Sequence, residues 1–154
     1  MKNKIIASIL IIAGFFGFVK FVKDYADRQS CVHVYVDYGV LKQNEVVSEC
    51  VPVDGRMNAL TILKHGGFNL EGTQKYGLQI VCRVDGLPSK DQESCLKMPP
   101  ENAYWALLVK KQLSVLDTNA KWGWAQDGVS KLILTKGDSV GLVFAKNGKF
   151  KWPN

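Results

Sequence analysis

Histidine is scarce in this sequence. There are only two histidines, His33 and His65, and there is no His-Glu-x-x-His segment, which is the motif typical of metalloproteases. Pairs of acids such as Asp85 and Asp91 are expected by chance in a chain with 14 acidic residues. The sequence therefore favours a protein that is not an enzyme.

Basic clusters and low-complexity segments are missing as well. The net charge is +6, from 20 Lys+Arg against 14 Asp+Glu, but the lysines are scattered and form no basic run. Without such a run or a nucleic-acid motif, nucleic acid is not an expected partner. The scattered positive charge is typical of a solubilising surface, and it also favours attraction to anionic lipid or cell-wall polymer.

The N-terminal segment is apolar between short basic flanks. A helix over residues 5–22 would be about 27 Å long at 1.5 Å per residue, which is short but sufficient to cross a bilayer. A cleaved signal peptide should end in a small-x-small site, but Ala26 is preceded by Lys23 at the partner position. We therefore expect an uncleaved signal anchor and linker over residues 1–30, followed by one domain over residues 31–154.

The cysteines lack the spacing of a metal or redox motif. The four cysteines are separated by 19, 32 and 13 residues, so there is no Cys-x-x-Cys and no close ligand pair. Structural zinc sites usually bring their ligands in pairs two to four residues apart. Cys31 and His33 are the only cysteine and histidine that lie close together. A metal site at this pair is the less favoured alternative to disulfides.

An even number of cysteines behind an export-type segment indicates two disulfides, and three pairings are open. We favour Cys31–Cys50, which would join two neighbouring strands, and Cys82–Cys95, which would close a polar loop. Because disulfides persist outside the cytoplasm, they predict that the domain lies outside the cell. Together with the expected anchor, they predict a single-pass protein of the cell membrane. Its N-terminus would be cytoplasmic and its domain extracytoplasmic.

Hydrophobic periodicity predicts several strands and one helix. Val32, Val34 and Val36 alternate with polar or aromatic residues, which is typical of a strand. The strands are expected over residues 31–38, 45–53, 76–86, 103–111 and 139–145, and Asn147-Gly148 predicts a hairpin turn. A helix of about ten residues is expected over 56–65, ended by Gly66-Gly67. This order predicts an α+β fold, with one helix on a mixed or antiparallel sheet.

Aromatic side chains are the first candidates for a binding site. Tyr104, Trp105, Trp122 and Trp124 would suit a stacking platform for a ring, a sugar or a peptide. The alternative is that Trp105 and one of the other two tryptophans belong to the core. On a strand, Tyr104 and Trp105 must face opposite sides, so one of them is expected outside the main core.

Two further features each allow a functional and a plainer interpretation. Arg83 and Asp85 share one face of the expected third strand. They would form a polar anchor beside the loop or take part in an exposed cross-strand ion pair, which contributes little. Residues 71–77 carry Gly72 and Gly77. They would form a mobile rim or a plain connection between the helix and the third strand.

Several stretches resemble the transcobalamin C-terminal-like domain, a β-grasp-type module, in its exported actinobacterial branch. They are "VYVDYG" (34–39), "ECVPVDG" (49–55), "NALTILKHGGFNLEGTQKYG" (58–77), "VCRVDGLP" (81–88), "CLKMPPENAYWALL" (95–108), "KWGWAQDGVS" (121–130) and "TKGDSVGLVF" (135–144). The resemblance covers about residues 32–145. It implies a β-grasp-like mixed sheet with one main helix.

The resemblance also implies a binding module. In vitamin carriers that contain this domain, it closes over cobalamin held mainly by a separate helical domain, which is absent from this sequence. We therefore expect no bound cofactor or metal, and a tethered extracytoplasmic module for a small ligand, serving a transporter. The tentative ligand residues are Tyr104, Trp105, Trp122, Trp124, Arg83 and Asp85. The alternative is a structural or protein-interaction subunit of a membrane or cell-envelope complex.

Overall fold

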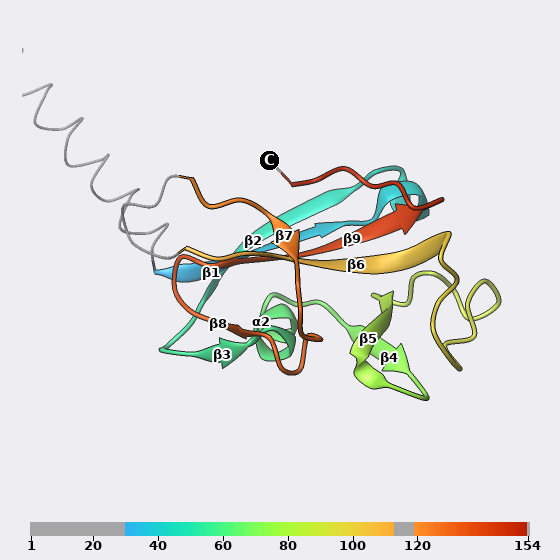
Figure 1. Ribbon diagram of the computed structural model, residues 1–154, viewed down its shortest axis with the longest axis horizontal. Coiled ribbons are helices and arrows are strands. Elements are labelled where there is room, and N and C mark those ends of the chain that lie inside the picture. The colour runs from blue at the N-terminus through green and yellow to red at the C-terminus, as the bar shows by residue number, and fades with distance from the viewer. Residues whose placement is uncertain (1–29, 113–118, 154) are drawn as a thin grey trace, which may run out of the picture.

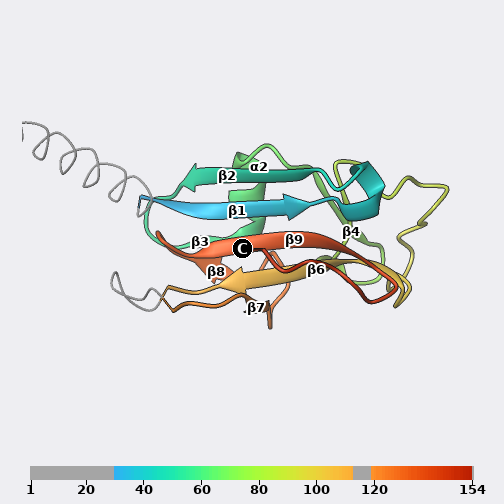
Figure 2. The ribbon, with the colours of Figure 1, turned by 90° about the horizontal axis from the view of Figure 1, so that it is seen from above.

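A five-stranded mixed sheet forms the largest layer of the domain. The computed structural model describes residues 30–112 and 119–153. The sheet contains β1 (Cys31–Asp37), β2 (Val46–Pro52), β6 (Ala103–Lys110), β7 (Gly123–Trp124) and β9 (Ser139–Lys146). Their order across the sheet is β2-β1-β9-β6-β7, as Figure 2 shows from above. The central pair, β1 and β9, is parallel, and the other neighbours are antiparallel.

A second layer covers one face of this sheet. It contains the helix α2 (Ala59–His65), the strand pair β3 (Met57–Asn58) and β8 (Ile133–Leu134), and the strand pair β4 (Leu70–Thr73) and β5 (Gly77–Val84). In Figure 1 these elements lie below the sheet, and the C-terminal segment lies above it. A short 3-10 helix, η1 (Gly39–Lys42), follows β1. The expected α+β class, with a mixed sheet and a helix packed on it, is confirmed.

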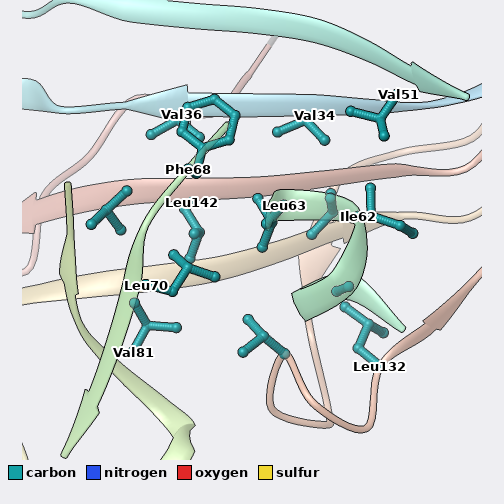
Figure 3. Close-up of a cluster of buried hydrophobic side chains, with 14 of the residues drawn as sticks. Val34, Val36, Val51, Ile62, Leu63, Phe68, Leu70, Val81, Leu132 and Leu142 are labelled. Atoms are coloured by element: carbon teal, nitrogen blue, oxygen red, sulfur yellow. The ribbon is translucent and has the colours of Figure 1, made fainter. Parts of the chain in front are cut away.

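The core lies between these two layers (Figure 3). Val32, Val34 and Val36 of β1 are fully buried, as their alternation with other residue types predicts. Ile62 and Leu63 of α2 face them from the second layer. Burial of such side chains contributes about 1.5–3 kcal/mol each relative to exposure, so this interface is the main source of stability.

The strands that periodicity predicts are found close to their expected bounds, but the third is placed differently. The expected strand 76–86 is β5, which pairs with β4 and not with the main sheet. Residues 71–77 are therefore not a plain connection, because they contain most of β4 and the turn into β5. Gly72 allows this turn, since a Cβ atom there would lie 2.2 Å from the backbone of Gly77.

The helix begins later than the sequence pattern predicts. Asn58 caps it, with its side-chain oxygen accepting a hydrogen bond from the backbone N–H of Thr61 at 2.9 Å. Met57 belongs to β3, so the expected ten-residue helix is shortened to seven residues. The expected glycine end is confirmed: the Gly66 N–H donates to the carbonyl of Ile62, and Gly67 has a φ of +87°.

Two disulfides link the domain internally. Cys31 pairs with Cys50 across β1 and β2, and Cys82 of β5 pairs with Cys95 in the loop that follows. The Cα–Cα distances are 5.6 and 5.8 Å. This is the pairing that the sequence favours.

The expected membrane anchor over residues 5–22 lies outside the described residues. Within the part of the chain that the structure describes, no helix has the length and apolar character needed to cross a bilayer.

Candidate functional site

The six expected ligand residues do not form one site. Tyr104 and Trp105 lie on opposite faces of β6, as alternation requires. Trp105 is only 6% exposed, and its ring makes edge-on contacts with Tyr38 and Phe144 at centroid distances of 5.7 and 5.5 Å. Its indole N–H donates to the carbonyl of Leu87 at 3.0 Å. Trp105 is therefore a core residue, which is the alternative weighed from the sequence.

Trp122 and Trp124 have different environments despite their spacing of two. Trp122 packs on the sheet face opposite the main core, where a Cβ atom at Gly141 would lie 3.2 Å from its ring. Its indole N–H is buried and has no hydrogen-bond partner among the described residues. Trp124 is 52% exposed. Of these two tryptophans, Trp124 therefore presents the larger ring surface for stacking on a ligand from solvent, and Trp122 is half-buried.

Trp124 belongs to an aromatic patch with Phe150 and Trp152. The ring centroids are 5.4 Å apart for Trp124–Phe150, 6.2 Å for Trp124–Trp152 and 5.2 Å for Phe150–Trp152. Phe150 and Trp152 were not among the expected site residues. Their signal was the Asn147-Gly148 turn, which reverses the chain after β9 and returns both rings beside β7.

Arg83 is a buried anchor for the loop after β5. It is 4% exposed; its Nε donates to the carbonyl of Pro88 at 2.9 Å, and a terminal nitrogen donates to the carbonyl of Glu93. Its other terminal nitrogen pairs with the Glu71 carboxylate at 2.8 Å. Of the two interpretations from the sequence, the polar anchor beside the loop fits Arg83. The cross-strand ion pair is also present, to Glu71 of β4, but the guanidinium is not exposed, because the loop folds back over it and covers it.

Asp85 lies in the turn after β5, with a φ of +51°. Its carboxylate accepts hydrogen bonds from the Tyr38 hydroxyl and, at 2.8 Å, from the Asn69 N–H. Burial of Tyr38, and then its hydrogen bond to Asp85, raise the pKa of the phenol well above its usual value. Arg83 and Asp85 therefore hold separate parts of the fold and do not form a shared anchor.

A groove lies between β5 and β6, and we call it the β5–β6 groove. It consists of two adjoining hollows of about 360 Å³ each. Both hollows are lined by Ile80 and Val81 of β5, Met98 of the loop, and Tyr104 and Trp105 of β6. One hollow extends to Pro99 and Glu101, and the other to Gln79, Ala106, Leu107 and residues 124–128. Of the six expected ligand residues, the groove brings together Tyr104, Trp105 and Trp124.

The charge of the β5–β6 groove is opposite to that of the chain. Among the described residues that line it, the only carboxylates are Glu101 at one end and Asp127 at the other, and none is a lysine or arginine. The chain as a whole carries a net charge of +6. The groove is therefore an apolar channel with a carboxylate at each end, and it suits a ligand that is apolar in the middle and cationic or neutral at its ends.

Two groups of side chains have the proximity that a metal site needs. Ligand atoms of Cys31, His33 and Cys50, and of Cys82, Glu93 and Cys95, lie within 4.8 Å of one another in each group. The cysteine sulfurs of both groups are bonded to each other in disulfides. Since the thiolate is the metal-binding form of cysteine, the oxidised chain offers neither group as a metal site.

No protein-family model matches this sequence, and no curated protein matches it. The function of the chain must therefore be inferred from the β5–β6 groove, the aromatic patch and the disulfides.

Proposed function

We propose that this protein is a membrane-tethered, extracytoplasmic binding module without catalytic activity, and that its ligand occupies the β5–β6 groove. The groove carries this proposal. Ligand sites are typically concave, mostly apolar and equipped with a few polar groups. Here Ile80, Val81 and Met98 supply apolar walls, Tyr104 adds a hydroxyl, and the acids lie only at the two ends.

The two disulfides support an extracytoplasmic location, because such bonds persist in oxidising compartments. Residues 5–22 would supply the tether, with the N-terminus in the cytoplasm. A single-pass tether next to the domain would hold the groove close to the membrane, where a ligand could be passed to a transporter.

The strand order supports a β-grasp-like fold and, with it, the proposed kinship to transcobalamin C-terminal-like domains. The first and last strands, β1 and β9, are parallel neighbours at the sheet centre, and α2 follows the first hairpin. The cobalamin that this kinship implies would be enclosed only in part, because each hollow of the groove lies at the lower end of small-molecule sites.

The experiment measures ligand binding by the full chain in nanodiscs. Tryptophan fluorescence and melting temperature are recorded against cobalamin, haem, sugars and short peptides. Met98 is 55% exposed and lines the groove, whereas Leu96, 56% exposed, lies two residues away in the same loop and is not part of the lining. Met98→Arg should weaken binding of any ligand found, and the matched control Leu96→Arg should not. A full panel without a response, or equal effects of both variants, would contradict the proposal.

The aromatic patch favours a second candidate, a structural or interaction subunit of a membrane or envelope complex. Trp124 and Trp152 are 52% and 43% exposed, and aromatic side chains of this kind are enriched at protein interfaces. Native membrane isolation followed by mass spectrometry would test it. Co-purification of a defined partner that is lost in Trp152→Ser supports this function, and recovery of the chain as a lone monomer contradicts it.

A further inference from the structure

The outer position of the main sheet is only half filled. β6 runs from Ala103 to Lys110, but β7 pairs with it only at Leu108 and Val109. Just beyond β7, the Ala125 N–H still donates to the carbonyl of Leu107 at 3.0 Å. Along Ala103–Ala106, no strand within residues 30–112 and 119–153 pairs with this edge of β6.

The backbone groups at this open edge can be assigned from alternation. In an antiparallel ladder, the N–H and C=O groups of successive residues point to opposite sides of the strand. Because the Leu107 carbonyl points toward β7, the N–H and C=O of Trp105 point to the same side, into the open stretch. The Ala103 N–H is already bonded to the Pro100 carbonyl. The edge therefore offers the carbonyl of Ala103, both groups of Trp105 and the N–H of Leu107.

The β5–β6 groove lies along this edge. β5 forms its other wall and, among the described strands, pairs with β4 alone. One end of the groove is bounded by residues 98–101. At the other end, the chain at Gly128 is packed so closely on β5 that a Cβ atom there would lie 2.6 Å from the Cα of Gln79. The accessible stretch of β6 thus has two defined ends.

The acids of the groove mark those ends. Glu101 lies next to the Ala103 end of the open stretch, and Asp127 lies next to the Leu107 end. Leu107 is four positions after Ala103 on the strand, which corresponds to about 13 Å. The same distance separates residues i and i+4 of an extended peptide, whose side chains at these positions also point to one face.

We infer that the β5–β6 groove binds an extended peptide segment of another protein, which adds as a strand to β6 in line with β7. An apolar side chain of the peptide would pack between Ile80 and Trp105. Basic side chains two residues before and two residues after it, on the same face of the strand, would approach Glu101 and Asp127. Strand addition takes its affinity from main-chain hydrogen bonds and its specificity from alternate side chains. This inference rests on the proposed binding function and names the ligand class.

The test uses a defined probe and the full chain in zwitterionic micelles, which do not attract a cationic peptide by charge. The probe is a fluorophore-labelled peptide, Lys-Thr-Val-Thr-Lys-amide, in which both lysines and the valine share one face, and its binding is measured by anisotropy. The charge-reversed peptide with Glu at both ends should bind at least about tenfold more weakly. Of two backbone N-methylated probes, one at both threonines and one at the valine, only one should lose binding, because only one set of amides faces β6.

Amide hydrogen exchange measured by NMR reports the edge directly. In the free protein, the amides of Trp105 and Leu107 should exchange faster than those of Tyr104 and Ala106, which face β9. Saturating probe should slow exchange at Trp105 and Leu107 by about tenfold or more and leave Tyr104 and Ala106 unchanged. The double variant Glu101→Gln/Asp127→Asn should weaken the probe about fivefold, as expected for two screened ion pairs.

The outcomes separate this inference from the proposed function. Binding of the probe without protection of Trp105 and Leu107 overturns strand addition. If cobalamin, haem or a sugar binds in a Met98-dependent way and the probe does not, the peptide inference fails while the proposed binding function stands. If neither the panel nor the probe responds to Met98→Arg, both fail.

Discussion

Replacing Arg83 should destabilise the domain far more than the loss of its ion pair with Glu71 alone. The guanidinium donates to the backbone carbonyls of Pro88 and Glu93 from a position that is 4% exposed. Hydrogen bonds from a charged group contribute about 1.5–3 kcal/mol each, and a buried acceptor left unpaired loses its hydration as well. Part of this free-energy cost is recovered if the loop after β5 opens, because water can then hydrogen-bond to the two carbonyls.

For Arg83→Met, which keeps much of the side-chain volume, we therefore expect a loss of about 3 kcal/mol in the free energy of unfolding. For a domain of this size, the melting temperature would fall by about 10 °C or more. Glu71→Gln removes only the ion pair, and its side chain is 40% exposed, so that variant should lose less than about 1 kcal/mol. Arg83→Lys keeps the charge but cannot reach both carbonyls, and it should fall between the two.

The assay is urea denaturation of the full chain without reductant, followed by tryptophan fluorescence. Both disulfides stay closed, so the variants are compared with the same cross-links in the unfolded state. A loss below about 1 kcal/mol for Arg83→Met, or equal losses for Arg83→Met and Glu71→Gln, would refute the role of Arg83 as the loop anchor.

Three further variants test other parts of the fold in the same denaturation assay. Replacing Cys82 and Cys95 by serine should cost about 3 kcal/mol, because a closed loop of this length no longer restricts the unfolded chain; an unchanged midpoint would contradict this. Asp138→Asn should cost about 2 kcal/mol, since the buried carboxylate accepts hydrogen bonds from two backbone N–H groups and the amide keeps one accepting oxygen. A loss below about 0.5 kcal/mol, which is typical of ordinary surface substitutions, would argue against it. Because the pKa of Tyr38 is raised in the fold, its stabilising contribution is complete below about pH 10 and is lost as the pH rises beyond that value. Tyr38→Phe should lose about 1 kcal/mol at pH 7 and show a smaller decline above pH 10, measured by repeating the denaturation at several pH values.

Local sequence signals predicted the main sheet well. The alternation of Val32, Val34 and Val36 depends only on the side-chain period of a strand, and the Asn147-Gly148 turn depends only on the tolerance of these residues for positive φ. The disulfide pairing followed from neighbouring strands and one short loop. Each of these signals is contained in a few consecutive residues.

The features that sequence reasoning missed depend on contacts between distant segments. The strand β4 contains Gly72, and a glycine that permits close backbone packing gives the same sequence signal as one in a flexible rim. Arg83 became a buried anchor only because the following loop folds back over β5. The aromatic patch joins Trp124 with residues that return after the last strand. No local pattern encodes any of these three contacts.

The two disulfides have a consequence for how the chain matures. Each one joins cysteines that are consecutive along the sequence: Cys31 to Cys50, and Cys82 to Cys95. If the domain crosses the membrane from residue 31 onward, the first two cysteines emerge together, and their native bond is the only one they can form before Cys82 appears. Oxidation in order of emergence therefore gives the native pairing without reshuffling.

The sheet, in contrast, cannot close until the end of the chain has arrived, because its central pair joins the first strand to the last. The cross-linked segments would remain incompletely folded, with an unpaired edge at β1, until β9 completes the sheet in one late step. A truncation before Ser139 would thus leave a correctly oxidised chain that cannot fold.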